Sequence, residues 1–302
     1  AQAGVVGFSD DGHPVLDPNL MRQALIYARA FDLPIINHCE IPELSRGRPI
    51  HEGWVSNRLG VVGVPTSAES IMVARDISLA ALTDGRLHLA HISTEESVGL
   101  IRNAKEKGLA VTCEVTPHHL SLSEETLLGS PNIDAIFNPL SPNAYDTNAK
   151  VNPPLRSMAD VDAMISALKE GIIDFIATDH APHSTVDKLT TLDEAAFGIS
   201  VLETALASML TLMHKGKIEL SLVLEKLTAA PAHFLGKQDI GTLRPGSIAD
   251  ITIFDPDSEW VVDSSKFLSK GKNTPLNGHS LKGRVITTIV GGTIVYSVNP
   301  DE

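Results

Sequence analysis

The chain has 302 residues, of which 43% are hydrophobic and 20% are charged, an ordinary composition for a globular protein. Its net charge of −13 at pH 7 argues against a nucleic-acid partner, which would require a basic surface. No apolar run approaches the roughly 20 residues that a membrane-spanning helix needs. We therefore expect one large domain, or one large and one small, with neither a nucleic-acid nor a membrane partner.

Cysteine is scarce, with only Cys39 and Cys113 present. Both lie in apolar stretches that look like strands, and no C-x-x-C spacing of a zinc finger occurs. Two buried free thiols are therefore expected, which fits a reducing compartment such as the cytoplasm.

Short apolar runs without polar alternation predict buried parallel strands. They span residues 5–8, 34–37, 87–90, 110–115 and 172–178. Signals for the start of a helix lie between them, at Asp17 with Pro18, Thr66 with Glu69, Ser93 with Glu96, and Ser157 with Asp160. Strands that alternate with helices of this length predict an α/β fold with a parallel sheet.

The pattern changes after about residue 235. From Gly241 onward, turn residues separate short runs rich in β-branched side chains. This pattern predicts an antiparallel β appendage at the end of the chain.

Polar side chains follow the predicted strands. Asp11 comes after the first strand, His38 after the second, His91 after the third and Asp179 after the fifth. A single histidine in such a place is more often a structural cap, but active sites of (β/α)8 barrels are built at the carboxyl ends of successive strands. Imidazole nitrogens and carboxylate oxygens suit one or two zinc ions. Asp179 could both bind the metal and move a proton.

Several segments resemble the bacterial type I dihydroorotases of the amidohydrolase superfamily. They are GFSDDG, INHCE, LAHIST, VTPHHL, NPPLR, FIATDHAPH and FLSKGKNTPLNG. The resemblance implies a metallo-dependent-hydrolase (β/α)8 barrel of the TIM type. Strands 4–8 of that barrel would lie in a catalytic part, residues 1–235. The C-terminal half of a small β-sandwich would occupy residues 236–302.

The resemblance also implies roles for individual residues. Asp11 would bridge two zinc ions, where much of the superfamily uses a carboxylated lysine. His38 and His91 would bind the second ion, and Asp179 would be both a metal ligand and the general acid and base. Substrate contacts would come from Asn152, His183, Phe197 and Gly198.

Other polar residues near these motifs have simpler interpretations. Glu40 and Glu114 are expected to orient their neighbours. His118 and His119 are expected to shape a loop. Arg156 either binds a carboxylate or lies in a mobile loop.

The front of the chain departs from the family. In the family, the first barrel strand carries an H-x-H-x-R motif that binds the first metal and holds a substrate carboxylate. This sequence contains no H-x-H. By resemblance the chain begins at the fourth strand, so we expect a missing N-terminal segment that completes the barrel.

The activity implied by the resemblance is that of a cyclic amidohydrolase, which acts on C–N bonds in cyclic amides. The reaction would be the reversible cyclisation of N-carbamoyl-L-aspartate to L-dihydroorotate in de novo pyrimidine biosynthesis. A homodimer, with aspartate transcarbamoylase as an optional further partner, is also implied. Two alternatives stay open: a hydantoinase or allantoinase on the same scaffold, and a non-catalytic dihydroorotase-like subunit that scaffolds a transcarbamoylase.

Overall fold

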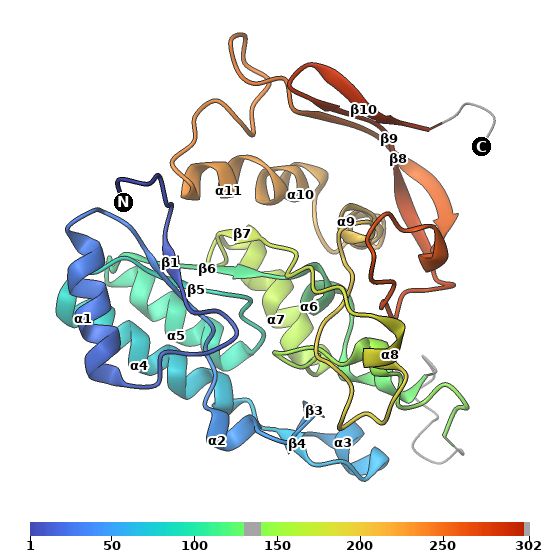
Figure 1. The fold of residues 1–302 in the computed structure, drawn as a ribbon, viewed down its shortest axis with the longest axis horizontal. Helices are drawn as coiled ribbons and strands as arrows, with labels where there is room; N and C mark the ends of the chain where they lie inside the picture. Colours follow the sequence, from blue (N-terminus) through green and yellow to red (C-terminus); the bar gives the residue numbers. More distant parts are fainter. Residues whose placement is uncertain (130–139, 299–302) are drawn as a thin grey trace.

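A computed structural model describes residues 1–129 and 140–298. At its centre lies a parallel sheet of five strands in the order β1-β2-β5-β6-β7 (Figure 1). These strands are β1 (Phe8–Ser9), β2 (Ile35–Asn37), β5 (Leu87–Leu89), β6 (Val111–Val115) and β7 (Phe175–Ile176). Each overlaps one of the five predicted apolar runs, so the predicted α/β fold with a parallel sheet is confirmed.

The long connecting helices cover one side of this sheet. They are α1 (Pro18–Arg29), α4 (Ser67–Thr83), α5 (Glu95–Glu106) and α7 (Met158–Lys169), and each contacts the next in this order. In Figure 1 they lie below the strands, whereas α10 (Leu220–Leu227) and α11 (Ala229–Phe234) lie above them. Helix–strand alternation of this kind is what positions loops at the carboxyl ends of the strands.

Shorter elements fill the loops. The helices are α2 (Pro42–Ser45), α3 (Trp54–Leu59), α6 (Pro117–Ser121), α8 (Thr185–Lys188) and α9 (Ala205–His214), with 3₁₀ turns η1 (Glu124–Leu128), η3 (Thr147–Ala149) and η4 (Ser264–Lys266). A separate two-stranded parallel ribbon pairs β3 (Ile50–His51) with β4 (Gly63–Val64). No helix in the part of the chain that the structure describes is long and apolar enough to cross a membrane.

Two of the predicted helix starts are confirmed by their caps. Asp17 Oδ1 accepts hydrogen bonds from the backbone N–H groups of Asn19 and Leu20, at 2.7 and 3.2 Å. Ser157 Oγ accepts from the N–H of Asp160 at 3.2 Å. Both helices therefore begin where the capping residue satisfies their free donors.

The two other predicted capping boxes are wrong, although the helices are present. Thr66 makes no side-chain cap to α4, and Glu69 accepts hydrogen bonds from Ser93 and Thr94 in the loop before α5 instead. The cap of α5 is Thr94, one residue later than predicted, which accepts from the N–H of Ser97. Glu69 is buried between the two helices, where these loop donors are its available partners.

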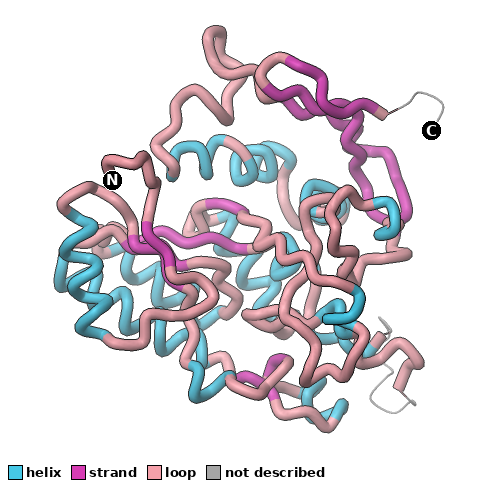
Figure 2. Tube along the Cα trace, in the orientation of Figure 1, coloured by secondary structure: helices cyan, strands magenta, loops and turns pink. Residues whose placement is uncertain are grey.

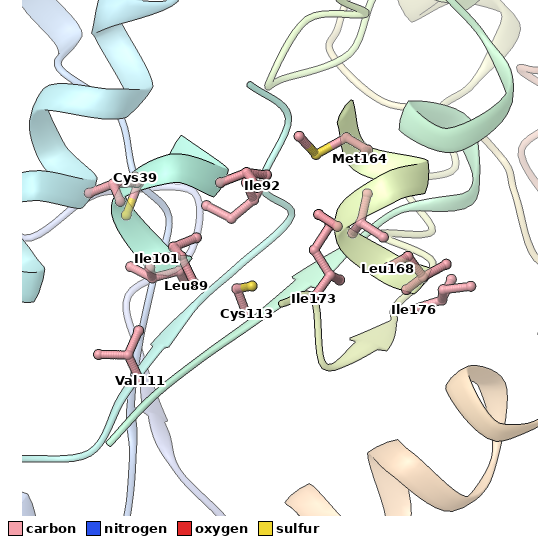
Figure 3. Packing of buried hydrophobic residues seen from close by; sticks show 14 of the residues in the cluster. Cys39, Leu89, Ile92, Ile101, Val111, Cys113, Met164, Leu168, Ile173 and Ile176 are labelled. Carbon is pink, nitrogen blue, oxygen red and sulfur yellow. The ribbon is translucent and has the colours of Figure 1, made fainter. Parts of the chain in front are cut away.

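The main hydrophobic core packs between the sheet and its covering helices. Figure 3 shows Leu89 and Cys113 of adjacent strands facing side chains from α5 and α7, among them Met164. Cys39 and Cys113 are both buried and free, as predicted. The core thus packs the strands against the helices, and the carboxyl ends of the strands continue into the loops.

The end of the chain forms an antiparallel sheet in the order β10-β9-β8, which confirms the predicted β appendage. Its strands are β8 (Ile251–Val261), β9 (Ser280–Val290) and β10 (Thr293–Ser297), which stand apart from the parallel sheet in Figure 2. Strand β9 of this antiparallel sheet packs against helix α9. Gly283 allows this contact, because a Cβ there would lie 2.2 Å from Leu210 Cδ1.

Candidate metal centre

Three side chains converge at the carboxyl edge of the parallel sheet. Asp11 follows β1, His38 follows β2 and His91 follows β5, and these strands are neighbours in the sheet. His38 Nδ1 lies 3.0 Å from His91 Nε2. Asp11 Oδ1 lies 3.4 Å from the first nitrogen and 3.5 Å from the second. Because parallel strands end at the same edge, residues far apart in the sequence meet there.

The three donor atoms fit a small divalent cation. Tetrahedral bonds of about 2.0–2.2 Å to nitrogen and oxygen place neighbouring ligand atoms roughly 3.3–3.6 Å apart. The observed separations of 3.0, 3.4 and 3.5 Å are close to that range. Among the described residues, this is the one group of His, Cys, Asp and Glu side chains whose donor atoms converge in this way.

The backbone is constrained at the same strand ends. Five non-glycine residues in the described chain have positive φ, and two of them are His91 at 34° and Asp179 at 45°. Such conformations cost of order 1–3 kcal/mol each and persist where the surrounding structure holds them. At His91 and Asp179 the constraint falls on side chains predicted to act at the metal site.

Glu40 sets the orientation of His38. Its Oε2 accepts a hydrogen bond from His38 Nε2 at 2.7 Å and one from the Asn152 amide at 2.9 Å. With its Nε2 proton held by Glu40, His38 would have Nδ1, the nitrogen that faces Asp11 and His91, available for a metal ion. The hydrogen bond from His38 supports the predicted orienting role of Glu40, and the bond from Asn152 places that residue beside the cluster.

The electrostatics of the cluster favour a positive charge. Burial of the His38 ring lowers its pKa, but hydrogen bonds to Asp11 and Glu40 outweigh burial and raise the pKa to about 9. Hydrogen bonds with His38 and His91 lower the pKa of Asp11. A divalent cation bound here would take the place of the His38 proton on Nδ1.

Asp179 stands beside this cluster, in the loop after β7. Burial raises the pKa of its carboxyl; His91 and His38 lower the pKa, whereas the charge of Asp11 raises it. The carboxyl of Asp179 is therefore close enough to the three converging residues for their charges to change its pKa. Its carboxylate is not one of the converging donors among the described residues, so its role as a metal ligand stays a prediction.

The remaining predicted substrate residues form a second group. His183 Nε2 donates a hydrogen bond to the Phe197 carbonyl at 2.7 Å. The N–H of Gly198 donates to the Lys150 carbonyl at 3.0 Å, which links this group to the segment that carries Asn152. Gly198 has a φ of 138°, where residues with a Cβ are strained, and a Cβ there would lie 3.0 Å from His183 Nε2.

Of the two roles considered for Arg156, the structure supports binding of a carboxylate, and that carboxylate is the one of Glu69. Its guanidinium is buried, with Nη2 3.6 Å from Glu69 Oε2, Nε donating to Ser93 Oγ at 3.0 Å, and Nη1 3.2 Å from His51 Nδ1. The side chains of Arg156 and Glu69 are only 2% and 3% exposed. Arg156 therefore belongs to a structural ion pair that neutralises Glu69 inside the protein.

The histidines after β6 have structural surroundings. His119 Nδ1 is 2.7 Å from Thr116 Oγ1, and its Nε2 donates to the Pro153 carbonyl at 3.1 Å. His118 is buried, and neither of its ring nitrogens has a partner among the described residues. The predicted loop-shaping role is confirmed for His119, which fastens the residue after Asn152.

Two buried lysines near the substrate group, Lys150 and Lys188, were not predicted as functional. Lysine is almost never fully buried, so a lysine in a polar stretch of sequence is normally taken as exposed. Nothing in the neighbouring sequence signals their burial.

Side chains that can hold a metal ion, gathered at the carboxyl ends of parallel strands with helices between them, are an arrangement typical of metal-dependent hydrolases built on a (β/α)8 barrel. Residues 1–295 match the model of the Amidohydrolase family. The chain therefore belongs to the amidohydrolase family.

Curated relatives and solved structures agree with this assignment. The chain is 46% identical to a dihydroorotase of Geobacter metallireducens over 98% of the chain and 66% of that protein. It is 50% identical to a dihydroorotase of Pelotomaculum thermopropionicum over 97% of the chain and 65% of that protein. Among solved structures, an L-hydantoinase (dihydropyrimidinase) from Arthrobacter aurescens aligns with a TM-score of 0.83 and 26% identity, over 98% of the chain and 66% of the neighbour. The chain thus spans slightly less than two thirds of the length of these relatives.

Proposed function

We propose that this chain carries the catalytic centre of a dihydroorotase, which interconverts N-carbamoyl-L-aspartate and L-dihydroorotate. The observation that carries the proposal is the convergence of Asp11, His38 and His91 in a chain 46–50% identical to proteins named dihydroorotase. A cyclic amide is a small-molecule substrate that suits a water-activating site of this kind.

We propose zinc as the metal, with one or two ions held by Asp11, His38, His91 and Asp179. Two imidazoles and carboxylates are a ligand set that zinc prefers. Zinc supplies Lewis acidity, which polarises a carbonyl group and lowers the pKa of water. Metal analysis of the purified protein by mass spectrometry tests both the identity and the number of ions.

The side chains then divide the remaining work. In the hydrolytic direction, water adds to the ring amide carbonyl, and the ring C–N bond breaks. Asp179 accepts a proton from the water and returns it to the leaving nitrogen, so that protons balance. Asn152, whose amide donates to Glu40, and His183 would orient the anionic substrate, together with the backbone at Phe197 and Gly198.

The decisive experiment compares substrates on one purified sample. We expect turnover of L-dihydroorotate and much slower turnover of hydantoin or allantoin. Asp179→Asn should lower kcat by at least about 100-fold, as loss of a general acid–base group typically does, and zinc content measured on the same sample shows how much of its role as a metal ligand is lost as well. Asp187→Asn is the matched control, because Asp187 is exposed and its carboxylate takes part in the capping box of α8. Faster turnover of hydantoin than of dihydroorotate would refute the assignment.

Zinc content and turnover of the same sample distinguish the enzyme from the scaffold alternative, because a non-catalytic subunit needs no bound zinc. The predicted homodimer, and its predicted association with an aspartate transcarbamoylase, are tested by light scattering of the protein alone and mixed with the transcarbamoylase. The resemblance supports these assemblies, and a monomer in both conditions would contradict them.

A further inference from the structure

Lys188, the last residue of α8, has a buried ammonium group surrounded by backbone carbonyls. Its side chain is 5% exposed. Nζ donates to the carbonyls of Thr147 and Lys150, both at 3.1 Å, and to that of Ala196 at 2.6 Å. An ammonium group has three N–H donors, and all three are used here.

Among the described residues, no carboxylate forms an ion pair with Lys188, whose hydrogen bonds go to backbone carbonyls. Burial and, to a smaller extent, the nearby charge of Lys150 lower the pKa of Lys188, whereas the charge of Asp146 raises it, and the resulting pKa is about 8. Lys150 itself donates to the Asp193 carbonyl and lies 4.3 Å from the ring centre of Phe197. Burial of a cation costs free energy that the hydrogen bonds to carbonyl groups must offset. The loss of any one of the three bonds would therefore leave the buried ammonium group less stable.

The three carbonyls belong to the two segments that carry the predicted substrate contacts. Thr147 and Lys150 lie in and just after η3 (Thr147–Ala149), immediately before Asn152. Ala196 immediately precedes Phe197 and Gly198. The Lys150 carbonyl also accepts from the N–H of Gly198 at 3.0 Å, so the two segments touch at the point where Lys188 binds both.

We propose that Lys188 is a positioning residue for substrate: its ammonium group holds the Asn152 segment and the Phe197–Gly198 segment at one fixed spacing. The proposal rests on the proposed function, since these segments are substrate contacts only if the chain is a dihydroorotase. A misplacement of about 1 Å in such contacts can cost on the order of 100-fold in rate.

Lys188→Met tests the proposal, with Lys226→Met as the matched control. Lys226 is also buried, and its Nζ donates to the Asp174 carbonyl at the opposite end of β7. We expect Lys188→Met to raise KM for dihydroorotate by about 10- to 100-fold with a smaller change in kcat. Lys226→Met should lower the melting temperature without changing KM. Wild-type KM in Lys188→Met, or an equal rise in both variants, would overturn the proposal.

Chemical rescue distinguishes the lost cation from general damage. Lys188→Ala leaves space for methylammonium, which carries the same three donors. We expect KM to return toward the wild-type value with saturating methylammonium, but not with tetramethylammonium, which has no N–H group. Equal effects of the two ions would count against a specific role for the donors.

Hydrogen exchange keeps the test independent of turnover. The Gly198 amide should exchange faster in Lys188→Met than in the wild type, and at the wild-type rate in Lys226→Met. If the wild-type protein fails to turn over dihydroorotate, the proposed function fails, yet this measurement still decides whether Lys188 holds the two segments together. Unchanged Gly198 exchange in a folded Lys188→Met protein would refute the positioning role.

Discussion

Replacement of Glu40 by Gln tests the organisation of the metal centre. Glu40 accepts hydrogen bonds from His38 Nε2 at 2.7 Å and from Asn152 at 2.9 Å. Glutamine keeps the size of the side chain and removes its charge. Loss of such a carboxylate partner of a metal-binding histidine typically costs 10- to 100-fold in affinity, or about 1.4–2.8 kcal/mol. We therefore expect zinc to bind Glu40→Gln at least about 10-fold more weakly.

The size of this loss should depend on pH. In the wild type, the proton on His38, with its pKa raised to about 9, competes with zinc at neutral pH. Removal of the Glu40 charge should also lower the pKa of His38, so that the proton competes less with zinc and part of the lost zinc affinity is offset at pH 7. The full loss should appear near pH 9, where proton competition is small in both proteins.

Zinc affinity is measured by competition with a chelator of known affinity at pH 7 and pH 9. Glu52→Gln is the control, because Glu52 is exposed and its ion pair among the described residues is with Arg48, at 3.7 Å. An unchanged zinc affinity of Glu40→Gln at pH 9 would refute the inferred role of Glu40 in orienting His38. An equal loss in both variants would show a general effect of charge.

Three further predictions concern stability and thiol chemistry. Arg156→Met should lower the free energy of unfolding in urea by about 3–5 kcal/mol, because it leaves Glu69 buried without its cation. Adding Glu69→Gln to the same chain should restore part of the lost stability. A loss below about 1 kcal/mol in Arg156→Met would contradict the buried ion pair. The raised pKa of His38 stabilises the metal-free protein fully below pH 6.5, and this contribution should disappear as pH rises through about 9; urea titrations across this range that show no decline would contradict it. Cys39 and Cys113, whose pKa values are raised by burial, should resist a thiol reagent in the native protein and react fully in urea, and native reactivity would contradict their burial.

Much of the fold could be predicted because its signals are local. Continuous apolar runs identified the five strands of the central parallel sheet, since buried parallel strands lack polar alternation. The convergence of Asp11, His38 and His91 followed from one topological rule, that parallel strands expose their carboxyl ends at the same edge. Only the rotamers and distances were left to the structure.

Other features could not be predicted because they depend on partners that are distant in sequence. Glu69 fits the spacing of a capping box, yet it binds Ser93, Thr94 and Arg156, which reach it only after α4 and α5 pack. Local spacing cannot reveal that competition, because a buried carboxylate takes the strongest donors around it. The same reason hid the burial of Lys188, whose three acceptors lie on two other segments.

The amino-acid sequence by itself determined the alternation of strands and helices, and it placed the acidic and imidazole side chains just beyond the strands, because both depend on short-range patterns. Tertiary structure alone decided which buried charges neutralise one another. It also decided that Glu40 aligns His38 and that Lys188 joins two loops. Those outcomes depend on desolvation and on distances between segments, which exist only once the chain has folded.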